Sequence, residues 1–420
     1  MSAIGWVDFS SEHREKVKSV IDLLSTPGVV DELGIGVIRD SFSDSLFPGI
    51  STIQTRAKYF LTVPRIFREY EKLSASKRRG KKLATYLNDH ENLCMEAMVA
   101  NHEDDPQGGI IGESFAEKQG EVQRKPSSVY WAGIRQFGLI RTPLSLQAFC
   151  RQFANPDQPI QDLVQGSDKT KGDDPDAAGQ KNATINGPAY KDGWIESLTV
   201  DLSKEEASFL SNQMQARVPM SLLGQILLDS QVQSQFLSLP SDCNFSTFAD
   251  EAPFLDQLPE SLRQIIAGAR GFWQLMYGAH VRYNCLLQKQ HGTSAVRDEF
   301  EAEWDEWLDK LQSFRWASWD TGLLWKLTKL HRRRVRDNTV HFVESWIEGL
   351  RSGDDTKSLD DLVTRQERFN KKGRARLNPT AEESIGEWIG IADLNYRLNV
   401  ARTIINDIHV ALAQPEGDDA

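Results

Sequence analysis

The sequence has no long hydrophobic run and no feature of an exported protein. No stretch reaches the roughly 18 uninterrupted apolar residues that a membrane-spanning helix needs. The first residues lack a basic segment followed by an apolar run, so we expect no secretory signal peptide. These absences predict a soluble, cytoplasmic protein without a membrane partner.

Cysteine is scarce and scattered. The chain has 4 cysteines and no C-x-x-C pair, which argues against a zinc ribbon and against a disulfide scaffold. A protein with isolated cysteines fits a reducing compartment. The four positions are Cys94, Cys150, Cys243 and Cys285.

The short motifs of the common enzyme classes are also missing. There is no phosphate-binding loop, no H-E-x-x-H, no deaminase signature and no G-x-S-x-G. His90 and Cys94, four residues apart, could share a helix face and bind zinc, but a half-buried cysteine beside a surface histidine explains them better. We therefore expect no cofactor and no metal site, and the sequence favours a protein that is not an enzyme.

Helical periodicity is what the chain does contain. Apolar residues follow helical spacing along Pro259–Leu287, and Ser203 with Glu206 forms a capping box. Further helices are expected over Phe9–Ser25 and over Ser51–Tyr70, where Pro64 should kink or divide the helix. Without sustained strand alternation or an internal repeat, the pattern predicts an all-α, multi-helix globular protein.

One stretch interrupts this pattern. Residues 155–190 are rich in Asp, Gly, Gln, Lys and Pro and poor in aromatic residues, so they bury too little apolar surface to offset their ordering. We predict a long mobile internal linker there. It would separate an N-terminal helical domain, 1–154, from a C-terminal helical domain, 191–413, followed by an acidic tail, 414–420.

Positive charge is concentrated in three clusters although the formal net charge is −11. Arginine side chains in such clusters suit phosphate oxygens, and nearby tryptophans could stack on unpaired bases. Each cluster, taken by itself, is also explained by a solvated helix end. For the tryptophans, helical spacing favours core packing. The clusters are Lys77-Arg-Arg-Gly-Lys-Lys82, His331-Arg-Arg-Arg-Val-Arg336 and Lys371-Lys-Gly-Arg-Ala-Arg376; Trp316, Trp319 and Trp325 precede the second.

Several longer motifs resemble a bacterial family known only as a domain of unknown function. The likeness covers nearly the whole chain, and the stretch 166–187 is its least typical part. The resemblance implies a bacterial cytoplasmic protein whose gene lies near helicase-type and phospholipase-D-like genes of genome defence, and it supplies no catalytic residue. The motifs are GW-x-DFS, DELGIG and FPG-x-STIQTRA-x-YF near the N-terminus, with Tyr277-Gly-Ala-His-Val-Arg-Tyr-Asn284 and Gly373-Arg-Ala-Arg-Leu-Asn378 further on.

Together these features predict a non-catalytic, DNA-associated or scaffolding subunit of a bacterial multi-protein system, acting in phage defence. Its partners would be DNA and a helicase-type or other protein encoded nearby. One alternative is an unrecognised enzyme such as a metal-dependent nuclease, with His102, Glu103, Asp104 and His280 as candidates. Another is a protein-binding adaptor. The predicted nucleic-acid-binding residues are Arg56, Arg78, Arg79, Arg332, Arg333, Arg334 and Arg336.

Overall fold

The computed structural model describes residues 31–102, 108–113, 124–152, 185–313, 319–378 and 388–414. Within these ranges the regular structure is helical, which confirms the all-α prediction, and the only extended pairing is the single bridge between Ile140 and Ile185. No helix in the described ranges is both long and apolar enough to cross a membrane. The predicted helix over Phe9–Ser25 lies outside the described residues.

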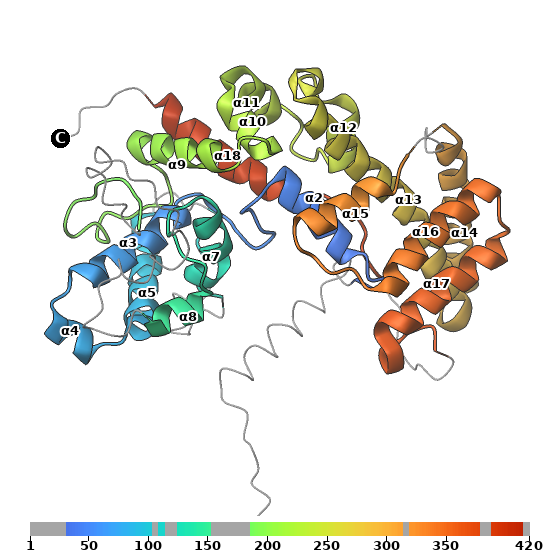
Figure 1. Cartoon of the computed structure of the whole chain (residues 1–420), viewed down its shortest axis with the longest axis horizontal. Helices are drawn as coiled ribbons and strands as arrows, with labels where there is room; N and C mark the ends of the chain where they lie inside the picture. Colours follow the sequence, from blue (N-terminus) through green and yellow to red (C-terminus); the bar gives the residue numbers. More distant parts are fainter. Residues whose placement is uncertain are drawn as a thin grey trace, which may run out of the picture. The chain divides into compact units, whose positions relative to one another are not determined.

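The described helices follow one another along the chain as Figure 1 labels them. They are α2 (Gly36–Leu46), α3 (Tyr59–Lys72), α4 (Ala75–Gly80), α5 (Leu83–Asn101), α7 (Pro126–Gln136), α8 (Leu146–Gln152), α9 (Lys204–Arg217), α10 (Leu222–Leu228), α11 (Ser230–Leu237), α12 (Phe245–Glu251), α13 (Glu260–His291), α14 (Ser294–Ser313), α15 (Gly322–Leu330), α16 (Asp337–Ser352), α17 (Thr356–Lys371) and α18 (Leu398–Ala413). Two 3-10 turns, Leu255–Gln257 and Lys372–Arg374, complete them.

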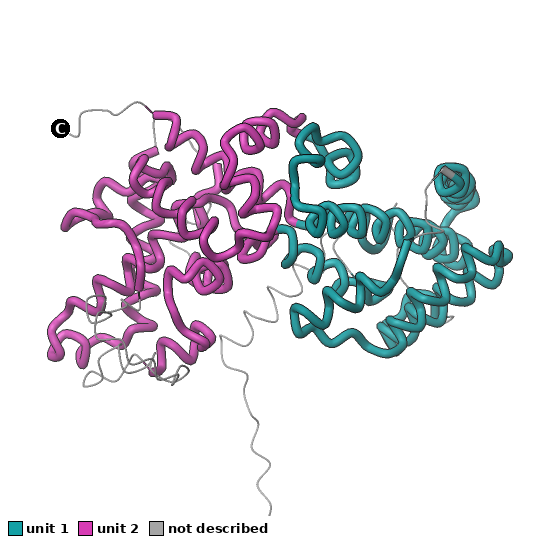
Figure 2. Tube along the Cα trace, turned by 45° about the horizontal axis from the view of Figure 1, so that its top comes forward, with its two compact units in different colours: residues 1–46, 242–396 teal, residues 47–241, 397–420 magenta. Residues whose placement is uncertain are grey.

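The chain folds into two compact units, and each unit is built from two separate stretches (Figure 2). Unit 1 comprises Met1–Leu46 and Asp242–Tyr396, and unit 2 comprises Phe47–Ser241 and Arg397–Ala420. The chain therefore passes between the units three times. The predicted linker, 155–190, falls in unit 2, and only its last six residues are described; Ile185 among them is buried and forms the bridge with Ile140.

Unit 2 is held together by aromatic packing between α3 and its neighbours. The Phe60 ring meets the rings of Tyr130 and Phe137 edge to face, with centroids 4.8 and 5.3 Å away. A Cβ atom on Gly49, whose φ is +83°, would meet the Phe137 ring at 2.7 Å, so only glycine fits this turn. Helix α18 packs against α9 and buries Ile404, Ile405 and Ile408.

Unit 1 is organised around α13, the longest helix described. Helix α14 packs along it, and α2, α12 and α17 contact it as well. Gly278 allows the close approach of α14, because a Cβ atom there would lie 2.4 Å from the Trp307 ring. The Trp346 indole, fully buried, donates to the Leu275 carbonyl oxygen at 2.9 Å. The predicted helix over Pro259–Leu287 is confirmed as α13.

The predicted helix over Ser51–Tyr70 is wrong in its first part. Helix α3 begins only at Tyr59, and it continues through Pro64. Before it, the backbone N–H groups of Thr55 and Arg56 donate to the Tyr130 hydroxyl oxygen at 2.8 and 3.0 Å. Because a distant side chain satisfies these groups, the segment forms turns in place of a helix. The predicted capping box at Ser203 and Glu206 is confirmed at the start of α9.

Candidate nucleic-acid interface

The second basic cluster, residues 331–336, forms the turn between α15 and α16 in unit 1. Two of its members are fixed by α2: the Arg333 Nε donates to Asp44 at 3.1 Å, and His331 contacts the Ser45 hydroxyl at 2.7 Å. A second carboxylate, that of Asp40, lies 3.6 Å from Arg333. Arg333 therefore anchors the turn to α2, and its charge is neutralised within unit 1.

The backbone of this turn ends α15 in an unusual way. The N–H of Arg333 donates to the Thr328 carbonyl oxygen at 2.8 Å. The N–H of Arg332 donates to the Lys329 carbonyl oxygen at 3.0 Å. These two bonds form a Schellman motif, in which the residue after the helix adopts a left-handed conformation and is usually glycine. Here that residue is Arg332, with a φ of +52°. The turn thus places an arginine where the backbone disfavours one.

Arg332 and Arg334 project from this turn into solvent. Both are exposed, and no acidic side chain in the described ranges pairs with either. They line a groove of about 410 Å³ with the half-buried Trp325 ring and the exposed Lys329. The groove therefore combines two uncompensated guanidinium groups, an ammonium group and an indole ring on one surface of unit 1. Hereafter we call it the arginine groove.

The structure brings the second and third basic clusters together. Arg336, at the start of α16, donates to Asn370 near the end of α17 at 3.0 Å. The third cluster follows directly, and its Lys371 pairs with Glu32 at 2.7 Å. Lys372 and Arg374 of that cluster remain exposed. Unit 1 therefore presents two adjoining basic segments that are separate in the sequence.

The first basic cluster lies in unit 2, on α4 and the turn that follows. Arg79 is exposed and Arg78 is half-buried. Lys81 pairs with Asp89 of α5 at 2.7 Å. The structure does not place this cluster in the same unit as the arginine groove.

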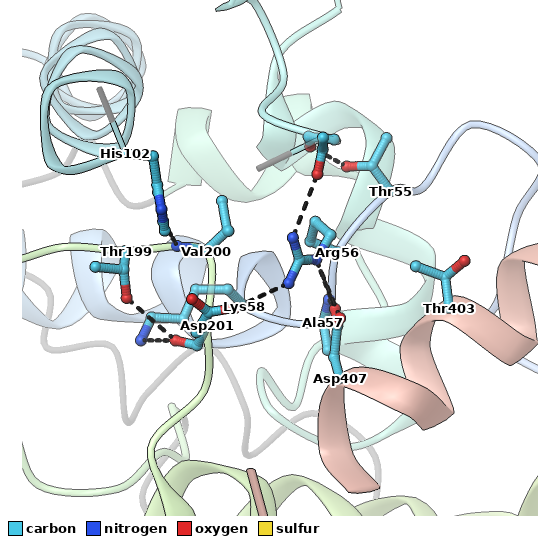
Figure 3. Close-up of polar contacts among 12 residues, drawn as sticks. Thr55, Arg56, Ala57, Lys58, His102, Thr199, Val200, Asp201, Thr403 and Asp407 are labelled. Atoms are coloured by element: carbon cyan, nitrogen blue, oxygen red, sulfur yellow. Dashed lines mark hydrogen bonds and ion pairs between the residues drawn. The ribbon is translucent and has the colours of Figure 1, made fainter. Parts of the chain in front are cut away.

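Arg56 occupies a different setting from the other predicted residues (Figure 3). Its Nε donates to both carboxylate oxygens of Asp407 at 3.0 Å, its Nη2 donates to Asp201 at 3.1 Å, and its Nη1 donates to the Gly108 carbonyl oxygen at 3.3 Å. Asp407 also accepts from the backbone N–H of Ala57 at 2.8 Å. All three guanidinium nitrogens thus hold unit 2 together, and the hydrogen bonds to these carboxylates keep the Arg56 pKa above its ordinary value despite burial.

The histidines considered for a nuclease lie in different units. His102 lies in unit 2, where its Nε2 accepts from the Val200 N–H at 3.1 Å. His280 is fully buried in unit 1, its Nδ1 lies 2.8 Å from the Met276 carbonyl oxygen, and burial lowers its pKa. Glu103 and Asp104 lie outside the described residues.

The two residues considered for zinc, His90 and Cys94, pack in different surroundings. The His90 ring stacks on Tyr86 with centroids 3.7 Å apart, whereas Cys94 is buried and its thiol pKa is raised by that burial. Among the described residues no group of three or more His, Cys, Asp or Glu side chains is arranged to hold a metal ion.

The sequence as a whole matches the model of one protein family. That model, a family of unknown function (DUF6361), spans residues 1–411. The chain belongs to DUF6361. No curated protein and no solved structure matches this chain.

The match confirms the resemblance to a family of unknown function. The role of the quoted motifs as markers of DUF6361 stays a prediction. In this DUF6361 chain two of the motifs contribute residues to charge networks, each built around a buried carboxylate, Glu32 or Asp407. DELGIG contributes Glu32, which is 2% exposed and lies between Lys371 and Arg376 of the third basic cluster. The motif from Phe47 to Phe60 contributes Arg56. The motif GW-x-DFS lies outside the described residues.

Sequence reasoning missed the acidic partners in these DUF6361 networks. Asp407 stands on the apolar face of α18, between Ile404 and Ile408. A carboxylate at such a position predicts a buried cation partner, because an unpaired buried charge is costly. Its partner, Arg56, is far away along the chain, so the sequence indicates that a partner exists without identifying it.

Proposed function

We propose that this DUF6361 protein is a non-catalytic nucleic-acid-binding subunit and that the arginine groove contacts the phosphate backbone. The observation that carries this proposal is the exposure of Arg332 and Arg334 without an acidic partner among the described residues, beside Trp325 and Lys329. Guanidinium groups make paired hydrogen bonds to phosphate oxygens. The net charge of −11 limits binding elsewhere on the molecule.

Five of the seven predicted residues divide into two classes on this proposal. Arg332 and Arg334 have the exposure that phosphate binding requires, and Arg336 and the neighbouring Lys372 and Arg374 could extend the contact. Arg333 and Arg56 already serve ion pairs within their own units. We therefore expect the exposed cations to determine the affinity for DNA. Arg333 and Arg56 should determine the stability of their units.

Fluorescence anisotropy of labelled single-stranded and duplex DNA, titrated through salt, tests the proposal. We expect the double variant Arg332→Glu, Arg334→Glu to weaken binding and to lower the log–log salt slope for duplex by about 2, because each lost phosphate contact removes roughly 0.9. The matched control is Lys289→Glu, Lys357→Glu, which reverses two exposed charges of unit 1 outside the groove. Equal weakening in both variants would show a general charge effect and contradict the proposal.

The same preparation separates binding from the nuclease alternative. Labelled DNA incubated with the protein and Mg²⁺ or Mn²⁺ should stay intact, since a non-catalytic subunit only binds. Cleavage that persists in the groove variant would favour an enzyme with a site elsewhere.

We further infer the cellular setting from the family resemblance alone. It supports a bacterial cytoplasmic multi-protein system of phage defence, in which a helicase-type or other protein encoded nearby would be the partner. Affinity purification of the tagged full chain from its natural host, followed by identification of the co-purified proteins, tests this setting.

A further inference from the structure

The exposed apolar side chains of unit 1 lie beside its basic clusters. Among the described residues of that unit, two large apolar side chains are exposed, Leu330 by 68% and Phe369 by 56%. Leu330 directly precedes the second basic cluster, and Phe369 lies two positions before the third. Cations attract phosphate groups, whereas an exposed ring gains from contact with another flat apolar face. The pattern therefore fits a ligand that carries both.

Helix packing brings Phe369 to the junction of the two clusters. Helices α16 and α17 lie side by side (Figure 1). At the start of α16 the Asn338 amide donates to Gln366 of α17 at 3.1 Å. Beside it, Arg336 donates to Asn370 at 3.0 Å. Gln366 lies three positions before Phe369 and four before Asn370, so these three side chains share one side of α17. Phe369 therefore borders the start of α16, where the two basic segments adjoin.

The arginine groove supplies a second ring, that of Trp325. Its indole N–H donates to Glu344 at 2.9 Å, which fixes the ring where it lines the groove. Among the described residues, neither the Trp325 ring nor the Phe369 ring packs against another aromatic ring, and no cation lies over either. The Trp325 ring is half-buried and reaches solvent in the groove, and the Phe369 ring is more than half exposed. Each can therefore stack on a flat ligand.

The cations beside these rings are not balanced by acidic groups. The groove lining includes Lys329, Arg332, Arg333 and Arg334 and no carboxylate. Of these four, only Arg333 pairs with acidic side chains in the described ranges. Three positive charges thus remain for a ligand, next to the Trp325 ring.

We propose that the nucleic acid bound at the arginine groove is single-stranded, with unpaired bases stacked on the rings of Trp325 and Phe369. This inference rests on the proposed function, because the cations of the groove hold the phosphates. Bases of a single strand turn freely and stack on exposed aromatic side chains. In a duplex the bases stack on one another, so a ring beside the phosphate-binding cations gains no such contact.

Anisotropy of three labelled probes with the full chain tests this inference. The probes are a single-stranded DNA oligonucleotide, the same strand with abasic positions, and the duplex of the intact strand. The abasic strand is the matched ligand, because it keeps every phosphate and lacks the bases. We expect the wild type to bind the intact strand about fivefold or more tightly than the abasic strand.

Paired variants then test each ring. Phe369→Leu keeps an exposed apolar side chain without a ring, and it should weaken binding of the intact strand about fivefold. Its salt slope and its affinity for the duplex should equal those of the wild type, because no charge is lost. Phe369→Tyr keeps the ring and should bind as the wild type does. Trp325→Phe should bind the strand more tightly than Trp325→Leu, since both lose the hydrogen bond to Glu344 and only the former keeps a ring.

The outcomes separate this inference from the proposed function. Equal wild-type binding of the intact and abasic strands, or wild-type binding of the strand by Phe369→Leu, overturns the single-strand inference. The proposed function still stands in that case if Arg332→Glu, Arg334→Glu weakens binding of the duplex. Anionic lipids also combine negative charge with apolar contact, so cosedimentation with phosphatidylglycerol vesicles is the last control. Vesicle binding that Phe369→Leu abolishes would identify a membrane surface and overturn the inference.

Discussion

At the scale of single residues, the proposed function draws support from an arginine in an unfavourable backbone conformation. A non-glycine residue in the left-handed region costs roughly 1–2 kcal/mol, and such strain often persists where a side chain is needed. Arg332 has this conformation at the end of α15, and its side chain reaches the arginine groove. On the proposed function, the protein gives up stability at this position to place a cation in the groove.

This trade gives a test in which stability and binding change in opposite directions. Arg332→Gly should raise the free energy of unfolding by about 1 kcal/mol, because glycine adopts this conformation without strain. The same change should weaken DNA binding. Denaturant unfolding and anisotropy measure the two effects.

Gly353 supplies the reverse control. It ends α16 with a φ of +71°, and a Cβ atom there would have no neighbour within 4 Å. Gly353→Ala should therefore lower stability by about 1 kcal/mol and leave DNA binding unchanged. A loss of stability in Arg332→Gly would show that the arginine side chain stabilises the turn and would contradict the trade.

At the scale of elements, periodicity in the sequence identified most of the helices and little of what joins them. The capping box of α9 and the apolar spacing of α13 depend on neighbouring residues, so the sequence displays them directly. The turns before α3 depend on Tyr130, which comes much later in the chain. The groove could be predicted only as a basic cluster, because its separation into exposed arginines and the anchored Arg333 depends on where α2 packs.

The contact between α13 and α14 gives a prediction at this scale. Gly278→Ala should lower the free energy of unfolding by about 1–3 kcal/mol, because the added methyl group overlaps the rigid Trp307 ring. Helix propensity alone would raise stability by up to about 1 kcal/mol. Denaturant unfolding with Gly80→Ala as the control separates the two effects, since a Cβ atom at Gly80 meets nothing within 4 Å. A stabilised Gly278→Ala would mean that α14 does not pack as described.

At the scale of the whole molecule, the two units depend on chain segments that are far apart in the sequence. Unit 2 is completed by α18, which covers α9. Local periodicity identifies α18 as an amphipathic helix, but its apolar face does not indicate which helices it covers. The helix pattern of the sequence therefore does not indicate which distant segments complete a unit.

Removing α18 tests this dependence. A chain that stops at Tyr396 retains the segments of unit 1 and should lose the cooperative unfolding of unit 2, because α9 then exposes its apolar side. A chain that stops at Gln414 is the control. Circular dichroism during denaturant unfolding measures the loss, and a synthetic peptide of residues 397–414 should restore it. Unchanged unfolding of the chain that stops at Tyr396 would contradict the division into these units.

The discontinuous build of the units also has a consequence for synthesis. Unit 1 requires residues up to Tyr396 and unit 2 requires α18, so neither core can close until nearly all of the chain has left the ribosome. At roughly 5–20 residues per second, synthesis of this chain takes tens of seconds. Until α18 emerges, the face of α9 that it covers is without its final partner. We therefore expect the nascent protein to bind chaperones that recognise exposed apolar segments during translation.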